Sequence, residues 1–127
     1  MDPRGQRIFL LLILAQVAHS VEEYSTRLYD IFAPARFVSG LFSHNLAVGF
    51  VIFNAAFDLF GLWCWAVPIR TSWRVVRAFV WFWVVIELGN GIGHLALAVD
   101  AGGYFPGAAT APLLILLAAW LAVRQFR

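Results

Sequence analysis

Charged residues are scarce in this chain of 127 residues, and lysine is absent altogether. Charged side chains make up 13% of the sequence and hydrophobic ones 62%, against roughly 25% and 45–50% in an average soluble domain. The nine basic residues are all arginines, and they are too few and too scattered for a nucleic-acid-binding face. The shortage of charge therefore argues against an ordinary soluble domain and predicts a single membrane domain.

Cysteine is almost as rare as charge. The single cysteine, Cys64, stands in the apolar run GLWCWAV, so an intrachain disulfide is excluded. A cysteine in such surroundings is usually a small buried hydrophobic residue.

Four long apolar stretches fill the space between the few charges. A membrane-spanning helix needs about 20 such residues. The predicted spans are residues 8–26, 43–67, 77–99 and 108–124. His44 and Asn45 are typical of a helix start, and Pro68 ends the second span.

The arginines indicate how these spans are oriented. With four spans, seven of the nine arginines fall on one side, whereas Arg27 and Arg36 fall on the other. The seven are Arg4, Arg7, Arg70, Arg74, Arg77, Arg124 and Arg127. The start also resembles a secretory signal, but cleavage after Ala18 would place Gln16 where a small residue is required. We therefore expect an all-α, polytopic four-helix bundle with both termini in the cytoplasm.

Polar side chains recur at helical spacing inside three of the spans. They are Gln16, His19, Glu22 and Glu23 in the first span, Asn54 and Asp58 in the second, and Glu87, Asn90 and His94 in the third. Steps of three and four residues place each set on one helix face. Since lipid cannot solvate such faces, we expect them to point into the bundle.

The depths of these residues agree as well. At about 1.5 Å per residue, His19 and His94 lie at similar distances from the outer ends of their helices, and Glu87 and Asn54 lie nearer mid-membrane. We therefore predict one pocket that opens toward the outer leaflet or the outer aqueous side. In the third span Gly89 and Gly93 form a small-xxx-small pair, which favours close helix packing. In the following loop, Tyr104 and Pro106 are interpreted as a turn or a lid over the pocket.

The stretch His19-Ser20-Val21-Glu22-Glu23 resembles the signature of the HXXEE family of small bacterial membrane proteins. Asn54, the spacing Glu87…Asn90…His94 and the turn GGYFPGAATAP extend the resemblance over nearly the whole chain. The resemblance implies a compact multi-span protein of a bacterial inner membrane. It implies no particular reaction, and Asp58 has no clear counterpart in the family pattern.

The residue types favour a metal site. Two histidines and several carboxylates suit zinc, iron or manganese, in a mononuclear or dinuclear site. The predicted ligands are His19, Glu22, Glu23, Glu87 and His94, with Glu22, Glu23 and Glu87 also as catalytic candidates. The predicted supporting residues are Gln16, Asn54, Asp58 and Asn90. A metal-dependent enzyme acting on a lipophilic or membrane-adjacent substrate is the function that this pattern favours, and a homodimer in the bilayer is compatible with it.

Other functions are open at this point. Without a metal, a protonated Glu87 or Glu22 would suit acid–base isomerisation or cyclisation of sterol-like or terpenoid lipids. Intramembrane carboxylates and histidines also mark proton or ion transport pathways. Haem ligation by His19 and His94 fits poorly beside so many carboxylates, and a polar cluster that only braces the bundle is the simplest alternative.

Overall fold

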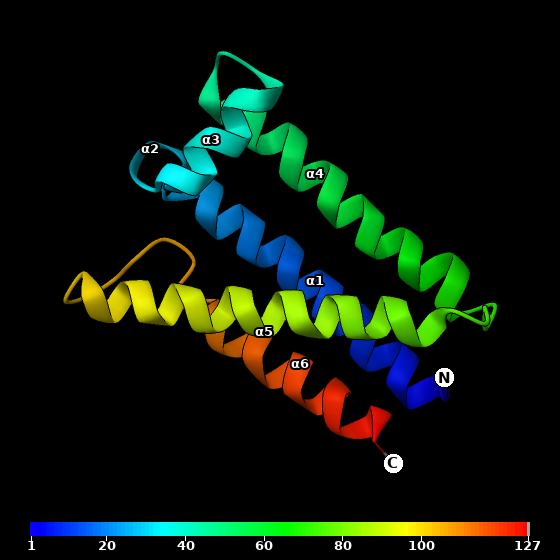
Figure 1. Ribbon diagram of the computed structural model, residues 1–127. Helices are drawn as coiled ribbons and strands as arrows, with labels where there is room; N and C mark the ends of the chain where they lie inside the picture. The colour runs from blue at the N-terminus through cyan, green and yellow to red at the C-terminus, as the bar shows by residue number, and fades with distance from the viewer. Residues whose placement is uncertain (127) are drawn as a thin grey trace.

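The computed structural model describes residues 1–126 as a set of helices joined by short turns (Figure 1). The elements are α1 (Pro3–Ser25), α2 (Leu28–Ile31), α3 (Ala33–Phe42), α4 (Leu46–Cys64), a π-helical turn η1 (Trp65–Ile69), α5 (Val76–Asp100) and α6 (Ala111–Gln125). The described residues form no strand, and the all-α class predicted from the sequence is confirmed.

The helix ends follow local sequence signals. The Asp2 carboxylate accepts a hydrogen bond from the Gly5 N–H at 2.8 Å and so caps α1. The Asn45 side chain caps α4 in the same way by accepting from Val48 N–H at 3.2 Å, as expected for a helix start. Pro68 lies within η1, where the second apolar stretch ends.

Three helices are long and apolar enough to cross a membrane: Pro3–Ser25, α4 with η1 (Leu46–Ile69), and Val76–Asp100. The fourth predicted span is shorter than expected. Residues 108–110 belong to a turn, and α6 has 15 residues, which is about 22 Å at 1.5 Å per residue against a hydrocarbon core of about 30 Å. The sequence thus predicted the apolar character of this segment correctly but overestimated its helical length.

Helix α1 runs through the middle of the bundle and packs on α4 and α6, while α5 packs on α6 (Figure 1). Phe9, Leu12 and Ile13 of α1 are fully buried, as are Trp83 of α5 and Leu114 of α6. Cys64 is also fully buried in this core, as predicted. The core occupies the half of the bundle nearer the termini, which leaves the opposite half of the α1–α5 contact for polar side chains.

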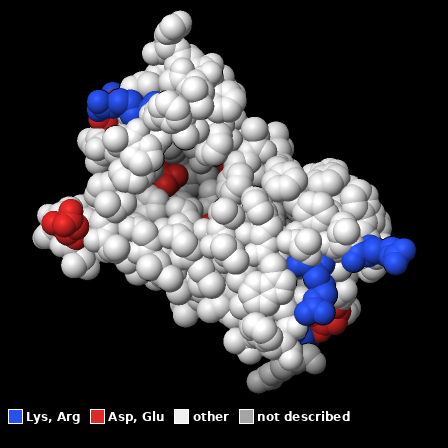
Figure 2. All heavy atoms as spheres, viewed as in Figure 1, with Lys and Arg blue, Asp and Glu red and all other residues white. Residues whose placement is uncertain are grey.

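The outer surface is largely apolar between two charged ends. Leu11, Leu14, Val85, Ile92 and Leu116 all point outward and are about half exposed or more, as lipid-facing side chains would be. Figure 2 shows charged atoms near the ends of the molecule, and the acidic atoms seen between them are recessed in a hollow.

Both termini lie at the same end of the bundle, together with the turn between α4 and α5 (Figure 1). An ion pair between Asp2 and Arg124 joins the two ends of the chain. The backbone N–H of Gly5, and then the Arg124 guanidinium, hold the pKa of Asp2 below its usual range. Arg127, counted above among the arginines of this side, lies outside the described residues.

The glycines of α5 do not pack as the sequence suggested. A side chain at Gly89 or Gly93 would meet nothing within 4 Å, whereas a Cβ at Gly91 would lie 2.6 Å from the Ile115 side chain and 2.9 Å from the Ala111 carbonyl oxygen. Close approach of α5 and α6 therefore depends on Gly91. The predicted small-xxx-small contact at Gly89 and Gly93 is wrong, because these two positions face away from the neighbouring helices.

A second close approach joins α3 to α4 at Gly49. A Cβ there would lie 1.9 Å from the backbone oxygen of Ser39. A backbone atom cannot rotate aside, so the steric clash can be removed only if the two helices move apart.

We predict that Gly49→Ala destabilises the protein by about 1–3 kcal/mol, the usual cost of overpacking. Thermal unfolding in detergent measures the change. Gly89→Ala is the matched control, because it adds the same methyl group in open space and should leave the melting temperature unchanged or slightly higher. Equal melting temperatures for Gly49→Ala and the unmodified protein would contradict the α3–α4 packing described above.

Candidate metal centre

Two buried histidines and one buried glutamate converge where α1 meets α5. His19 and Glu23 lie one turn apart on α1, and His94 comes from α5. Glu23 Oε1 lies 2.8 Å from His94 Nε2 and 3.2 Å from His19 Nε2. One ligand atom from each residue lies within 4.8 Å of the other two. We call these three residues the His–Glu cluster.

The cluster is shielded from solvent. The exposed fractions are 0% for His19, 7% for Glu23 and 6% for His94. The two imidazole rings meet edge to face with their centroids 4.6 Å apart. At such burial a carboxylate requires a compensating positive charge or good hydrogen bonds.

A hydrogen bond to the backbone fixes the orientation of the His94 ring. Its Nδ1 lies 2.6 Å from the backbone oxygen of Pro106. A carbonyl oxygen can only accept, so Nδ1 carries the hydrogen and donates it. In the neutral ring, Nε2 therefore presents a lone pair toward Glu23.

The His19 ring is held in the same way by a side chain. Its Nδ1 lies 2.6 Å from Thr110 Oγ1. The Thr110 hydroxyl donates its own hydrogen to Glu22 Oε1 at 2.6 Å, so it must accept from His19. The neutral His19 ring also presents the lone pair of Nε2 toward Glu23.

Three acceptor atoms thus face one another inside the bundle. One shared proton can join Glu23 to one imidazole nitrogen, but the Nε2 atom of the other imidazole then has no hydrogen-bond donor. Within the described part of the chain, His19 Nε2 has no hydrogen-bond partner, since its 3.2 Å approach to Glu23 lacks hydrogen-bond geometry. A divalent cation among the three atoms would satisfy all of them at once.

The donor set also suits a metal chemically. Metal-bound histidines almost always donate their second ring N–H to a carbonyl or another acceptor, as both rings do toward the loop after α5. Two imidazole nitrogens and one carboxylate oxygen are the ligands of many catalytic zinc sites and of non-haem iron(II) oxygenases. Such three-ligand sites leave coordination positions open for water or substrate.

Glu22 was predicted as a ligand, but its carboxylate points from α1 to the loop that joins α5 to α6 (residues 101–110; the α5–α6 loop). It accepts hydrogen bonds from the backbone N–H groups of Gly107, Ala109 and Thr110 at 3.0, 3.1 and 2.9 Å. The hydroxyls of Thr110 and Tyr104 donate to it as well. Both oxygens are therefore occupied by donors from the loop, close to the N-terminus of α6, where negative charge is favoured.

Tyr104 adds a surface contact to the set of hydrogen bonds by which Glu22 anchors the loop. Its hydroxyl donates to Glu22 Oε2 at 2.5 Å, and the side chain is 59% exposed. Partial desolvation, followed by the adjacent Glu22 carboxylate, raises the pKa of Tyr104, so the phenol stays protonated as a donor. The sequence left Tyr104 and Pro106 open as a turn or a lid; in the structure they tie the loop to α1 and α5.

Gly107 brings the loop backbone against both histidines. Its φ is +94°, a left-handed conformation that favours glycine. A Cβ at this position would lie 2.4 Å from His94 Nδ1 and 2.8 Å from His19 Cε1. The residue must therefore be glycine for the loop to cover the cluster.

The remaining predicted residues form a second polar group on the termini side of the His–Glu cluster, joined by Ser20, which the sequence did not single out. Its members are Gln16, Ser20, Asn54, Asp58, Glu87 and Asn90, which we call the amide–carboxyl cluster. Asn90 Nδ2 donates to Gln16 Oε1 at 3.3 Å and lies 3.5 Å from Glu87 Oε2. Gln16 Nε2 donates to Ser20 Oγ at 3.0 Å. These residues therefore bond to one another rather than to the cluster histidines.

Ser20 connects this group to α4. Its hydroxyl oxygen lies 3.2 Å from Asn54 Oδ1 and 3.4 Å from Asp58 Oδ1. Glu87 is fully buried, and its Oε1 has no hydrogen-bond partner among the described residues. Glu87 was predicted both as a ligand and as a catalytic group, but the structure places it with the amides and not in the His–Glu cluster.

The sequence did not identify the residues that orient the histidines. Thr110, the backbone oxygen of Pro106 and Gly107 all come from the α5–α6 loop. The available signal was the turn GGYFPGAATAP itself, because an unusual run of glycine, proline and threonine beside a polar pocket indicates a shaped loop.

A cavity of about 390 Å³ adjoins the His–Glu cluster. Glu23 and His94 form part of its wall, together with residues of α3, α4 and α5. Figure 2 shows a hollow on this face of the molecule, with acidic side chains at its floor. The size lies at the lower end of the roughly 300–1,000 Å³ typical of small-molecule sites.

The loop anchor generates a testable expectation. Glu22→Gln replaces a carboxylate that accepts from five donors by an amide with a single acceptor oxygen. We predict that hydrogen exchange at the amides of Gly107, Ala109 and Thr110 accelerates at least about tenfold. This corresponds to a decrease of about 1.4 kcal/mol in the free energy of local opening of the loop. Mass spectrometry of deuterated peptides measures it.

Glu23→Gln serves as the matched control for that experiment. It changes the neighbouring carboxylate, whose contacts are to the histidines and not to the loop amides. Unchanged loop exchange in Glu22→Gln, or equal acceleration in both variants, would show that Glu22 does not anchor the loop.

Comparison with known proteins agrees with the motif in α1. A family described as "Protein of unknown function with HXXEE motif" matches residues 10–121, which include the His–Glu cluster, the amide–carboxyl cluster and the α5–α6 loop. No curated protein and no solved structure gives a significant match. The resemblance noted in the sequence is confirmed: this chain belongs to the HXXEE family.

Proposed function

We propose that this protein is an integral membrane enzyme that works with one divalent transition-metal ion, held by His19, Glu23 and His94. The observation that carries the proposal is the direction of the two imidazole rings. Each Nδ1–H is used by an acceptor of the α5–α6 loop, and each Nε2 turns toward Glu23 Oε1. Imidazole nitrogens with one carboxylate favour zinc or iron over magnesium or calcium.

The arrangement supports a single ion rather than two. A dinuclear carboxylate site would draw on Glu22 or Glu87 as additional ligands. The Glu22 oxygens are occupied by the loop donors, and Glu87 lies beside Asn90. Over residues 1–126, the residues that converge in metal-ligand geometry are those of the His–Glu cluster.

The proposed setting is a cell membrane, the inner membrane in a bacterium, crossed four times with both termini cytoplasmic. Arg70, Arg74 and Arg77 lie in or next to the α4–α5 turn, at the same end as the termini, in agreement with the positive-inside rule (Figure 1). Helix α6 is short because the α5–α6 loop folds inward to reach the histidines. This helix of 15 residues, apolar up to Val123, then completes the fourth crossing together with that loop.

A metal ion bound there would polarise an oxygen of the substrate, activate water, or in an iron form react with dioxygen. The protein residues supply the rest. The α5–α6 loop keeps both rings in the ligating tautomer and shields them from solvent. The cavity beside Glu23 and His94 gives a lipophilic substrate access to the open side of the cluster.

One observation favours a second candidate function. The Glu87 carboxyl is fully buried and one of its oxygens has no partner within residues 1–126. A carboxyl in that position would exchange protons with a lipid substrate or along a proton path, without a metal. Under this alternative the His–Glu cluster is a proton-sharing group.

Metal content distinguishes these functions. Protein purified in detergent and reloaded with zinc or iron(II) is expected to hold one ion per chain. His19→Ala, Glu23→Gln and His94→Ala should each lose it, or bind at least about 100-fold more weakly, because each removes one of three ligands. Elemental analysis after dialysis, and competition with a coloured chelator, give these values.

His44→Ala is the matched control. His44 is exposed at the start of α4, outside the cluster, so its loss should leave one ion per chain. Glu87→Gln should also retain the ion. Absence of stoichiometric metal from the unmodified protein after reloading, or equal loss in His44→Ala, would reject the metal proposal in favour of the proton-based one.

A further inference from the structure

The cavity beside the His–Glu cluster is a groove with two unlike walls. It is lined by Gln16, Glu23, Leu28, Phe32, Pro34, Ala35, Val38, Ser39, Phe50, Phe53, Asn54, Phe57, Ile86, Asn90 and His94. One wall is mainly apolar and comes from α2, α3 and α4, with Ile86 of α5 beside it. The other is polar and comes from residues of α1 and α5, with Asn54 of α4. We call it the phenylalanine groove.

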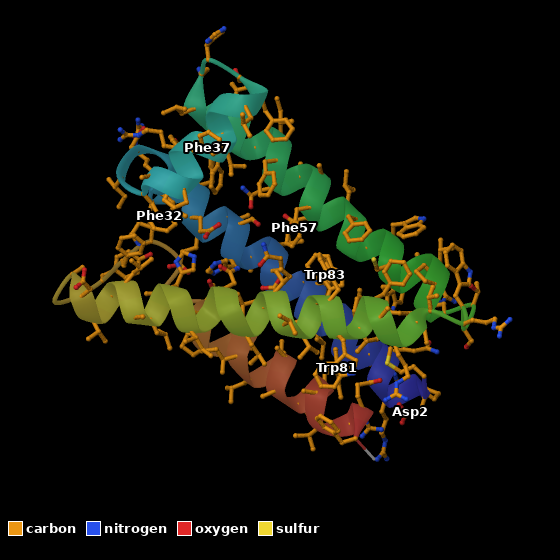
Figure 3. The ribbon with its side chains drawn as sticks, viewed as in Figure 1. Asp2, Phe32, Phe37, Phe57, Trp81 and Trp83 are labelled. Atoms are coloured by element: carbon orange, nitrogen blue, oxygen red, sulfur yellow. The ribbon has the colours of Figure 1, made fainter. Side chains whose placement is uncertain are left out.

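The apolar wall is built mainly from aromatic rings. Phe50, Phe53 and Phe57 lie at helical spacing along α4, and Phe53 and Phe57 are stacked with centroids 6.2 Å apart. Phe57 also packs against Trp83 of α5 between the two helices, with the ring centroids 4.6 Å apart (Figure 3). This pair closes the groove toward the termini, so an occupant must enter from the side of α3.

The opening of the groove faces the membrane. Helices α4 and α5 approach each other at their connecting turn and diverge toward α3 (Figure 1). Phe53 and Ile86, which line the groove from these two helices, remain 39% and 38% exposed on the apolar outer surface. A molecule dissolved in the bilayer can therefore reach the groove without crossing water.

The polar wall of the metal-free protein selects against an anionic occupant. Among the described residues that line the groove, none is an arginine or lysine, and Glu23 is acidic. An anionic head group would meet Glu23 with no cationic side chain to balance it. With a divalent cation bound, Glu23 would neutralise one of its two charges and the cluster would keep one positive charge, so discrimination against an anion is expected of the metal-free protein.

The same wall offers hydrogen bonds to a neutral oxygen. The Asn54 amide nitrogen donates to the backbone oxygen of Phe50 at 3.0 Å, which uses one of its two N–H groups. The second N–H is available to an acceptor in the groove. Gln16 and Asn90 add amide groups along the wall that leads to His94.

We infer that the phenylalanine groove binds a lipophilic molecule of small-molecule size that bears an uncharged oxygen group, a hydroxyl or a carbonyl, and takes it up laterally from the bilayer. The apolar body lies against the rings of α4, and the oxygen faces the amides and the His–Glu cluster. The inference rests on the proposed function, since it names the class of substrate that would meet the metal site. A two-chain phospholipid exceeds the volume of about 390 Å³.

Photolabelling tests this directly. The probe is a dodecanol that carries a diazirine near the end of its chain, and the protein is reconstituted in phosphatidylcholine nanodiscs and reloaded with metal. We expect crosslinks on the groove-lining parts of α3 and α4, mapped by peptide mass spectrometry. Excess unlabelled dodecanol should reduce them at least about fivefold. In a parallel sample stripped of metal with a chelator, dodecanoate at pH 8 should compete much less than dodecanol.

Two substitutions on α3 make a matched pair. Val38→Trp fills the groove and should reduce labelling of its walls at least about fivefold, while Leu41→Trp adds the same ring to an exposed position (66%) and should not. Ala35→Phe fills the groove from a different position and serves where Val38→Trp folds poorly. Labelling that persists in both filled variants, or that is confined to the outer lipid-facing surface, would overturn the inference. Stronger competition by dodecanoate than by dodecanol in the metal-free sample would also overturn it.

Metal content is measured on the same samples, which separates the inference from the proposed function. Stoichiometric metal without groove labelling would reject the groove as a binding site and leave the metal proposal standing. Groove labelling that responds to Val38→Trp in protein that holds no metal would support the groove and reject the metal proposal.

Discussion

The carboxylate of Glu23 lies between the Nε2 atoms of two buried histidines, and the surrounding structure is organised to hold it there. Placing these groups inside an apolar bundle is costly unless each polar atom finds a partner. On the side of the α5–α6 loop, Thr110 and the Pro106 carbonyl accept hydrogen bonds from the two Nδ1–H groups. Within the bundle three acceptor atoms meet, and the proposed cation would satisfy them together.

This constraint gives each position of the motif a separate physical role. His19 and Glu23, one turn apart on α1, point toward α5 and form two corners of the cluster. Glu22, one position before Glu23, turns toward the α5–α6 loop and binds its backbone N–H groups. Ser20 reaches the polar residues of α4, and Val21 is 59% exposed on the apolar surface. Two adjacent glutamates are required because Glu23 is part of the His–Glu cluster and Glu22 binds the loop that orients the two histidines.

Helical periodicity was enough to predict much of this architecture. Spacing of three and four residues, with matching depths, predicted inward-facing polar residues on α1 and α5, of which the structure brings His19, Glu23 and His94 together; the apolar stretches located the long helices. Periodicity could not separate Glu22 from Glu23, because adjacent residues lie on the same broad helix face and only the partner segment decides their directions. It also could not place Glu87, whose depth along α5 matched the pocket but whose neighbours are Asn90 and Gln16. Thr110 and Gly107 act through loop geometry, for which sequence spacing carries no rule.

The metal proposal makes a definite statement about which atoms surround the ion, and X-ray absorption at the metal edge of the reloaded protein tests it most directly. The account predicts two imidazole nitrogens and at least one carboxylate oxygen in the first coordination sphere. It further predicts that His94→Ala removes one imidazole contribution while His44→Ala removes none. A coordination sphere that lacks imidazole, or one that His44→Ala and His94→Ala change equally, would contradict a metal centre formed by His19, Glu23 and His94.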